Sequence, residues 1–190
     1  MRVRKLALRR FPKNAYETLA NDCALILEEP KRYFQNDWLF HGEARIQYMV
    51  DKYRGLVCPD FRDGPSCGTV ACVAGWTTTQ HGCAGQDDQN LYTAFKLLGT
   101  TNYHMMFYEN DPFAFSLRKL FGYDLPPNYY NDFKVGSREY AEWGVQRIQA
   151  FMDRFEDRLK RTTYTYAGRG ANRKVVTVHC PDGRVIRMDE

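Results

Sequence analysis

The sequence lacks any apolar run of about 18 residues, the length that a membrane-spanning helix requires. Near the N-terminus the only apolar run is Leu-Ala-Leu at residues 6–8, far short of the roughly 7 to 15 apolar residues in a secretory signal. Six cysteines without an export signal predict free thiols in a reducing compartment. We therefore expect a protein that has no membrane-spanning helix, is made in the cytoplasm and can be incorporated in a virion.

Well-known catalytic and cofactor-binding motifs are missing too. The chain has no P-loop, no G-x-G-x-x-G, no H-E-x-x-H and no G-x-S-x-G, and it has neither an internal repeat nor a low-complexity tract. The sequence therefore contains no motif for nucleotide hydrolysis, dinucleotide binding, zinc-dependent proteolysis or an α/β-hydrolase triad. We expect no cofactor.

Acidic residues are absent from residues 1–13, which hold six of the 27 Lys and Arg residues. Because the whole chain has a net charge of +4, the remainder is close to neutral, at −2. A second basic run covers residues 158–174. Such a basic arm suits docking on an acidic protein, a nucleic acid or an anionic lipid, and it is also common in solvated chain ends. Aromatic residues in the two runs, Phe11, Tyr164 and Tyr166, would suit stacking on single-stranded bases.

Hydrophobic periodicity predicts a mainly helical body. Apolar residues recur with helical spacing in residues 14–29, 43–55, 87–99, 111–122 and 137–161, the last of which predicts the longest helix. Asn14 and Glu17 have the spacing of a capping box, and Asp111 followed by Pro112 is typical of a helix start.

The end of the chain shows a different pattern. Residues 174–180 and 184–188 alternate in polarity around Pro181-Asp182-Gly183, which predicts a β-hairpin. Because an isolated hairpin is marginally stable in water, it must lie on the helices, join a further strand or pair with another chain. We predict a mainly α fold: a basic N-terminal arm (1–13), a single compact multi-helix domain (14–161), and a linker with a β-hairpin tail (162–190).

The segment Ser66–Trp76, SCGTVACVAGW, contains two cysteines, two glycines and a tryptophan. Ser66 suits a helix N-cap, so we expect a helix that opens at Cys67 and runs to about Thr79. A cysteine at a helix N-terminus lies at the positive end of the helix dipole, which favours the thiolate. One hypothesis is therefore a cysteine hydrolase with Cys67 as nucleophile and His179 as base, although no third member of a triad is evident.

The same region offers the ligand types of a zinc site. Cys58, Cys67, Cys72, His81 and Cys83 fall within 26 residues. On a regular helix Cys67 and Cys72 diverge by about 140°, so one metal cannot bind both. The remaining metal hypothesis is a site that uses Cys58, Cys67, His81 and Cys83.

The favoured interpretation of this segment is structural. Its second half, VACVAGW, is apolar on every side, which is typical of a helix buried all round. Cysteine behaves in such a helix as a small hydrophobic residue. Trp76 would then lie in the core with its indole N–H close to a polar partner.

Residues 67–76 carry the motif C-G-T-x-x-C-x-x-G-W, followed by AFKLLG, HMMFYEND and WGVQRIQAFM. Together these segments resemble an uncharacterised family of small proteins from bacteria and their phages. The resemblance covers residues 59–155 and leaves the basic arm and the hairpin outside it. It implies an origin and a fold, and it brings no activity.

These features favour a non-enzymatic protein that works through protein–protein contacts, as an accessory or structural subunit of a phage or bacterial assembly and as part of an oligomer. The alternatives are the cysteine hydrolase and nucleic-acid binding through the basic arm. Partner contacts are expected from the arm and from a tyrosine-rich loop, through Arg2, Arg4, Lys5, Arg9, Arg10, Tyr123, Tyr129 and Tyr130.

Overall fold

A computed structural model describes residues 11–35, 39–41, 43–52, 69–83, 87–100, 111–121 and 133–189. The α-helices in this part of the chain are α1 (Ala15–Glu28), α2 (Glu43–Lys52), α3 (Val73–Gln80), α4 (Asp87–Leu97), α5 (Pro112–Leu120), α6 (Arg138–Arg154) and α7 (Glu156–Arg161). The strands are β1 (Leu39–His41), β2 (Thr69–Ala71), β3 (Thr163–Ala167), β4 (Lys174–His179) and β5 (Val185–Arg187). The predicted mainly α fold with a C-terminal hairpin is confirmed.

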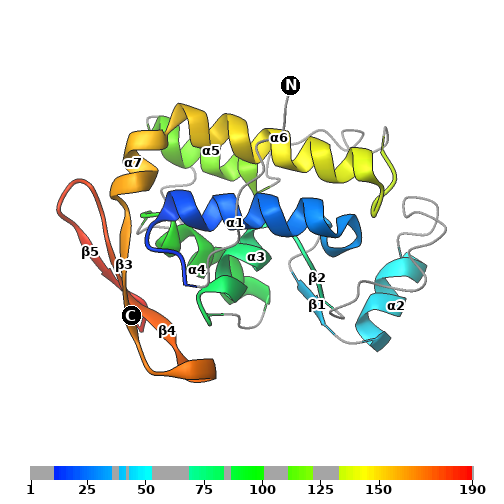
Figure 1. The fold of residues 1–190 in the computed structure, drawn as a ribbon, viewed down its shortest axis with the longest axis horizontal. Coiled ribbons are helices and arrows are strands. Elements are labelled where there is room, and N and C mark those ends of the chain that lie inside the picture. The colour runs from blue at the N-terminus through cyan, green and yellow to red at the C-terminus, as the bar shows by residue number, and fades with distance from the viewer. Residues whose placement is uncertain are drawn as a thin grey trace.

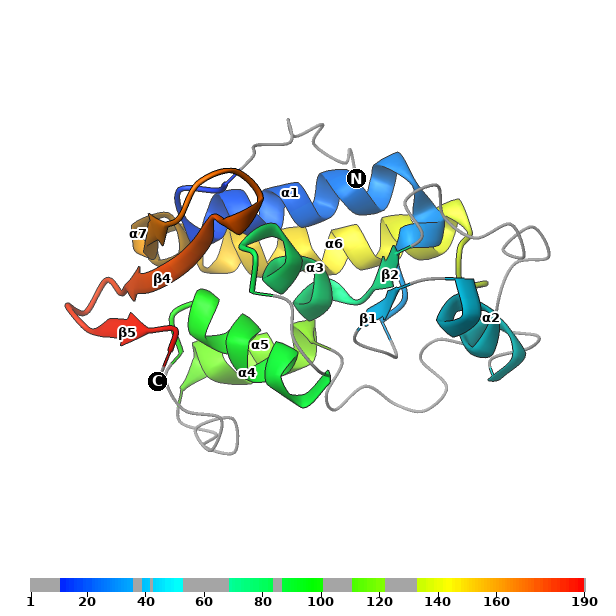
Figure 2. The ribbon, with the colours of Figure 1, turned by 90° about the horizontal axis from the view of Figure 1, so that it is seen from below.

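The helices form the body of the molecule, and the sheet of β3, β4 and β5 lies at one end of it, next to α7 (Figure 1). The short pair of β1 and β2 lies towards the opposite end, close to α2 (Figure 2). Helices α1 and α6 run side by side and antiparallel, with α3 and α4 packed below them. The molecule is therefore elongated, with a different type of structure at each end.

The local signals in the sequence account for the helix starts. Asn14 caps α1, since its side chain accepts a hydrogen bond of 2.8 Å from the backbone N–H of Glu17. Asp111 caps α5 in the same way, with Pro112 as the first helical residue. The segment 137–161 differs from the prediction, because it forms two helices that meet at Phe155 instead of one.

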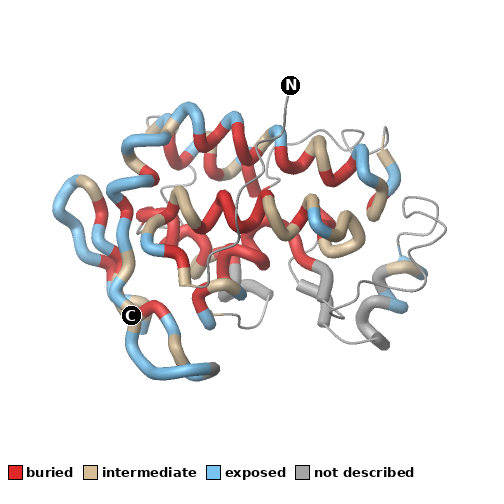
Figure 3. Tube along the Cα trace, in the orientation of Figure 1, coloured by how far each residue is buried: buried red, intermediate tan, exposed pale blue. Residues whose placement is uncertain are grey.

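The core lies where α1, α3, α4, α5 and α6 face one another, and Figure 3 shows buried stretches along these helices. Tyr33 and Tyr140 are the largest fully buried side chains of the described residues, and the hydroxyl of Tyr33 donates a hydrogen bond of 2.8 Å to the side chain of Gln35. The ring of Tyr33 lies directly against Gly144 of α6. The lack of a side chain at Gly144 therefore gives Tyr33 its place beside the helix.

The expected helix start at Cys67 is wrong. Residues Thr69–Ala71 form β2, which pairs antiparallel with β1, and the helix begins only at Val73. Cys72 caps it, since its sulfur accepts a hydrogen bond from the N–H of Gly75 at 3.5 Å. The reason is a tertiary contact: pairing with β1 outweighs the local preference of this segment for a helix.

The interpretation of α3 as a buried helix is confirmed, because residues 73–78 are all buried. Trp76 has the predicted polar partner, since its indole N–H donates a hydrogen bond of 2.8 Å to the carbonyl of Arg32. The guanidinium of Arg32 also lies over the Trp76 ring, 4.7 Å from its centroid. The helix is thus the centre of the fold.

The C-terminal hairpin joins a strand within the same chain. β4 pairs antiparallel with β5 and, on its other side, with β3, so the strand order is β3-β4-β5. Tyr164, Val178 and Ile186 are opposite one another and face the body of the molecule. A third strand and an apolar face explain how this hairpin is stable.

Replacing Gly144 by alanine should destabilise the protein by roughly 1 to 3 kcal/mol, the usual cost of overpacking, although alanine favours a helix by about 1 kcal/mol. The new Cβ would overlap the buried ring of Tyr33, which its hydrogen bond to Gln35 holds in place. Urea denaturation measures the change. Ala150→Gly at an exposed site of α6 is the control, with an expected loss of about 1 kcal/mol from helix propensity alone. A Gly144→Ala protein as stable as wild type would contradict the close contact.

Candidate functional site

A buried histidine connects three separate parts of the chain. His81 follows α3, and its side chain is fully buried. Its Nε2 lies 2.9 Å from the hydroxyl of Thr18 in α1, and its Nδ1 lies 2.8 Å from the hydroxyl of Tyr166 in β3. Each hydroxyl can donate or accept, so a neutral imidazole makes both hydrogen bonds. His81 therefore joins the central helix to α1 and to the C-terminal sheet.

Two tyrosines of β3 complete this cluster. The ring of Tyr164 packs edge-on against His81, with 4.5 Å between the centroids, and its hydroxyl donates a hydrogen bond of 2.8 Å to the carbonyl of Leu97. The ring of Tyr166 stacks on the imidazole, with 5.9 Å between the centroids. Burial raises the pKa of both phenols, so they remain protonated at neutral pH. The cluster is uncharged.

Burial lowers the pKa of His81 to about 3, because a protonated ring would lose its hydration. The imidazole is therefore neutral at physiological pH, and both of its nitrogens are occupied by protein hydroxyls. A general base needs a nitrogen that reaches a substrate. The geometry gives His81 a structural role, as the residue that joins α1, α3 and β3.

Asp22 of α1 is a second buried polar group. It accepts a hydrogen bond of 2.8 Å from the hydroxyl of Thr77 and another from the side-chain amide of Gln80, both in α3. Burial raises its pKa well above the usual range for aspartate. Sequence reasoning missed Thr18 and Asp22, although two polar residues four apart within the apolar face of α1 are the signal that could have revealed them.

The described thiols lie within the structure as packing groups. Cys23 and Cys72 are buried in the core. Burial raises the pKa of Cys23, Cys83 and Cys180, which keeps these thiols protonated at neutral pH. Cys83 donates a hydrogen bond to the carbonyl of His81 at 3.4 Å. A thiolate nucleophile is not expected at these three positions.

Of the two residues of the hydrolase hypothesis, the described part of the chain includes His179. Cys67 lies outside the described residues, and the helix that was to activate it starts six residues later, at Val73. His179 lies exposed on β4, where its Nε2 is 2.9 Å from the hydroxyl of Thr165 in β3. The helix dipole that motivated the hypothesis therefore acts at Cys72, whose sulfur already caps the helix.

The metal hypothesis keeps two described residues, His81 and Cys83, while Cys58 and Cys67 lie outside the described residues. The nitrogens of His81 face Thr18 and Tyr166, and the sulfur of Cys83 faces the backbone of His81. The described residues contain no group of three or more His, Cys, Asp or Glu side chains placed to hold a metal ion. Cys67 and Cys72 do not lie on one helix, since Thr69–Ala71 between them is a strand.

The root of the basic arm, residues 11–14, is bound to the C-terminal sheet. Asn14 pairs with Thr163, and the N–H of Tyr164 donates a hydrogen bond of 3.3 Å to the carbonyl of Lys13. The hydroxyl of Tyr166 donates a hydrogen bond of 2.7 Å to the carbonyl of Pro12. Since the same hydroxyl contacts His81, the buried cluster also fixes the place where the arm begins.

The side chain of Arg173 also contacts the arm root. The guanidinium of Arg173 lies 4.3 Å from the centroid of the Phe11 ring and 4.8 Å from that of Tyr166. The Phe11 and Tyr166 rings meet edge to face, with 5.6 Å between centroids. Residues 11–13 of the first basic run therefore contact residues of the second, 158–174, at one end of the molecule. We call this region, residues 11–14 together with residues 158–187, the basic end.

All eight expected partner-binding residues lie outside the described residues: Arg2, Arg4, Lys5, Arg9, Arg10, Tyr123, Tyr129 and Tyr130. Among the helices that the structure describes, none combines the length and the apolar character needed to cross a membrane. The structure thus describes the predicted interaction surface at the basic end.

The buried His81 should make stability depend on pH. Unfolded chains bind this proton near pH 6.5, and the folded protein binds it only near pH 3. The stabilisation is complete above about pH 6.5 and is lost as the pH falls towards 3, by about 1.4 kcal/mol per pH unit. Asp22 acts in the opposite direction, because a raised carboxyl pKa costs stability as the pH rises above its unfolded value.

His81→Gln keeps Asp22 and removes the imidazole, so a comparison with wild type isolates the histidine. The stability advantage of wild type over His81→Gln should shrink between about pH 6.5 and about pH 4. Urea unfolding at a series of pH values measures it. An advantage that stays constant across this range would contradict a neutral, buried His81.

Thiol alkylation tests the assignment of the cysteines. Iodoacetamide at about pH 6 should leave Cys23 and Cys72 unmodified in the native protein, because both side chains are buried, and should modify them after denaturation. Mass spectrometry of tryptic peptides gives the extent at each site. If Cys67 instead reacts well ahead of the other five thiols, the cysteine hydrolase gains support.

Comparison of the chain with protein-family models, with curated proteins and with solved structures finds no match.

Proposed function

We propose that this protein is a non-enzymatic interaction component that binds an acidic surface of a protein partner at its basic end. The observation that carries the proposal is the attachment of the arm root to the C-terminal sheet. Hydrogen bonds from Tyr164 and Tyr166 hold the backbone of Lys13 and Pro12, and Arg173 covers Phe11. Two basic segments, separated by more than a hundred residues in the sequence, are thus attached to each other at the C-terminal sheet.

The charge on the two segments is of one sign. Residues 1–13 and 158–174 each carry six Lys or Arg residues and no acidic residue, so the rest of the chain has a net charge of −8. Charges gathered at one end raise the local concentration of an oppositely charged partner and speed its association. Ten residues span at most about 35 Å, so the charges of residues 1–10 stay within that distance of the sheet.

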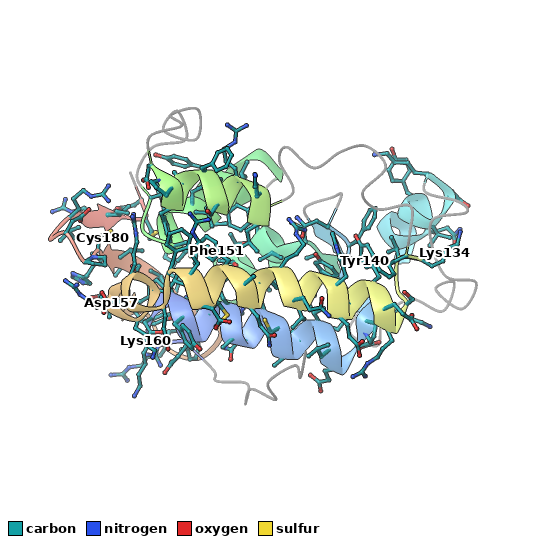
Figure 4. The ribbon with its side chains drawn as sticks, turned by 90° about the horizontal axis from the view of Figure 1, so that it is seen from above. Lys134, Tyr140, Phe151, Asp157, Lys160 and Cys180 are labelled. Atoms are coloured by element: carbon teal, nitrogen blue, oxygen red, sulfur yellow. The ribbon has the colours of Figure 1, made fainter. Side chains whose placement is uncertain are left out.

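Not every basic side chain of the basic end is available to a partner. Lys160 and Arg161 each form an exposed ion pair with an acid one turn earlier, Glu156 and Asp157. Such exposed pairs are weak, at about 0.3 to 0.5 kcal/mol, and a partner can displace them. Figure 4 shows Asp157 and Lys160 at the same end of the molecule as Cys180, far from Lys134. Arg169 and Lys174 add two exposed charges to this end.

The aromatic residues of the basic end favour a protein partner over single-stranded nucleic acid. Binding of single strands relies on aromatic faces on which bases stack. Tyr164 packs against His81, while Tyr166 lies between His81 and Phe11. The guanidinium of Arg173 lies over the rings of both Phe11 and Tyr166. These three rings are therefore engaged within the protein.

The wider role that we propose is that of an accessory or structural subunit in a phage or bacterial assembly. This part rests on the resemblance of residues 59–155 to small proteins of bacteria and their phages, and on the arm as the element that reaches a neighbour. The tyrosine-rich loop around Tyr123, Tyr129 and Tyr130 would add contact area, since tyrosine offers a large surface at a low entropic cost.

Fluorescence anisotropy with a labelled glutamate-rich peptide tests the proposal. The wild-type protein should bind the peptide, with an affinity that falls as salt is added. Arg169→Gln with Lys174→Gln should weaken binding by about three- to tenfold, the effect of two exposed charge contacts. The matched control is Lys134→Gln with Arg138→Gln, which removes the same charge from the other end of α6 and should change binding little.

Two further probes decide the class of partner. A single-stranded DNA oligonucleotide of equal charge and vesicles of anionic lipid should bind more weakly than the peptide. Tighter binding of the DNA or of the vesicles would contradict a protein partner. Equal losses in the two double variants would show that net charge, and not the basic end, is responsible.

A further inference from the structure

The two edges of the C-terminal sheet differ. The β3 edge already receives an extended segment of the chain, since Asn14 pairs with Thr163 and Tyr164 donates to Lys13. On the opposite edge, β5 pairs with β4 on one side, and no other strand in the described part of the chain pairs with it. An edge strand offers main-chain N–H and C=O groups to an incoming strand. The outer edge of β5 is therefore the candidate site for binding a partner strand.

The main-chain hydrogen bonds define which residues face outwards. The N–H of Cys180 donates to the carbonyl of Arg184 at 2.9 Å, and the N–H of Met188 donates to that of Val176 at 3.1 Å. Even-numbered residues of this strand thus direct their main-chain groups towards β4. Because these directions alternate along an antiparallel strand, the N–H and C=O of Val185 point away from β4.

The side chains on this edge define what it would accept. Val185 is 57% exposed, one of the most exposed large apolar side chains in the described part of the chain, and it lies in a row with Thr163 and His179 across the sheet. Arg187 lies in the next row on the same face, which is exposed, whereas Ile186 points into the core. A strand opposite Arg187 is best matched by a carboxylate, since opposite charges across a strand pair stabilise it.

We propose that β5 binds an extended acidic segment of the protein partner, which adds to the sheet as a fourth, antiparallel strand. The inference rests on the proposed function and specifies its binding mode. A second copy of this chain fits less well, because its own β5 brings Arg187 against the same basic end. The edge is only three residues long, so main-chain pairing contributes few hydrogen bonds and the charge of the basic end must contribute too.

A pair of N-methylated peptides separates strand addition from attraction by charge alone. The parent probe is a labelled ten-residue peptide of alternating threonine and glutamate. In antiparallel pairing the glutamates opposite Val185 and Arg187 direct their N–H groups at β5, and the threonine N–H groups point away. Methylation of the glutamate amides should weaken binding by at least about fivefold, the value of a single net hydrogen bond. Methylation of the threonine amides should leave it within about twofold.

Protein variants test the same edge. Val185→Pro removes the outward N–H and keeps the bonds to β4, and an edge strand tolerates proline. It should lower the affinity for the parent peptide by about the same fivefold, while Val185→Thr should not. Circular dichroism and thermal unfolding confirm that each variant folds, and a failure of Val185→Pro to fold leaves the decision with the peptides.

The outcomes distinguish the two proposals. Equal binding of both methylated isomers, or wild-type binding by a folded Val185→Pro protein, would overturn strand addition and leave the charged interaction intact. Failure of every acidic peptide to bind would overturn the proposed function itself. On binding, protection of the Val185 amide from hydrogen exchange would support strand addition directly.

Discussion

The hydrogen-bonded imidazole of His81 is the contact on which the arrangement of this molecule depends. It joins the end of α3 to α1 through Thr18 and to β3 through Tyr166, in a site without solvent access. Loss of either partner would leave a buried polar nitrogen unpaired, which costs about 1 to 3 kcal/mol. Because the hydroxyl of Tyr166 also holds Pro12, the same contact determines where the basic arm leaves the sheet. The core and the proposed interaction surface are therefore physically connected.

Through this connection, an uncharged, buried cluster supports the residues of the basic end. Tyr166 contacts Arg173 and the arm root as well as the buried His81. The tyrosine is thus a fixed support between the apolar body and the solvent. A basic segment that starts from a fixed support loses less conformational freedom on binding than one that is free along its whole length. The helical body acts as the scaffold for the sheet end.

Local sequence signals were sufficient for part of the fold. Helix periodicity and the caps at Asn14 and Asp111 located helices correctly, since these signals depend on residues within one or two turns. The apolar character of VACVAGW identified the buried central helix and the polar partner of Trp76. The same reasoning placed the helix start at Cys67 and was wrong there, because the pairing partner of Thr69–Ala71 lies thirty residues earlier.

The sequence by itself determined the helical class, the buried helix, the hairpin and the presence of two basic runs. Only the tertiary structure decided that residues 163–167 form a strand, that Thr18 and Tyr166 meet His81, and that the arm root joins the sheet. The physical reason is the range of the interactions. Caps and helical faces arise between neighbours in the chain, whereas strand pairing and a shared imidazole bring together residues that no local pattern relates.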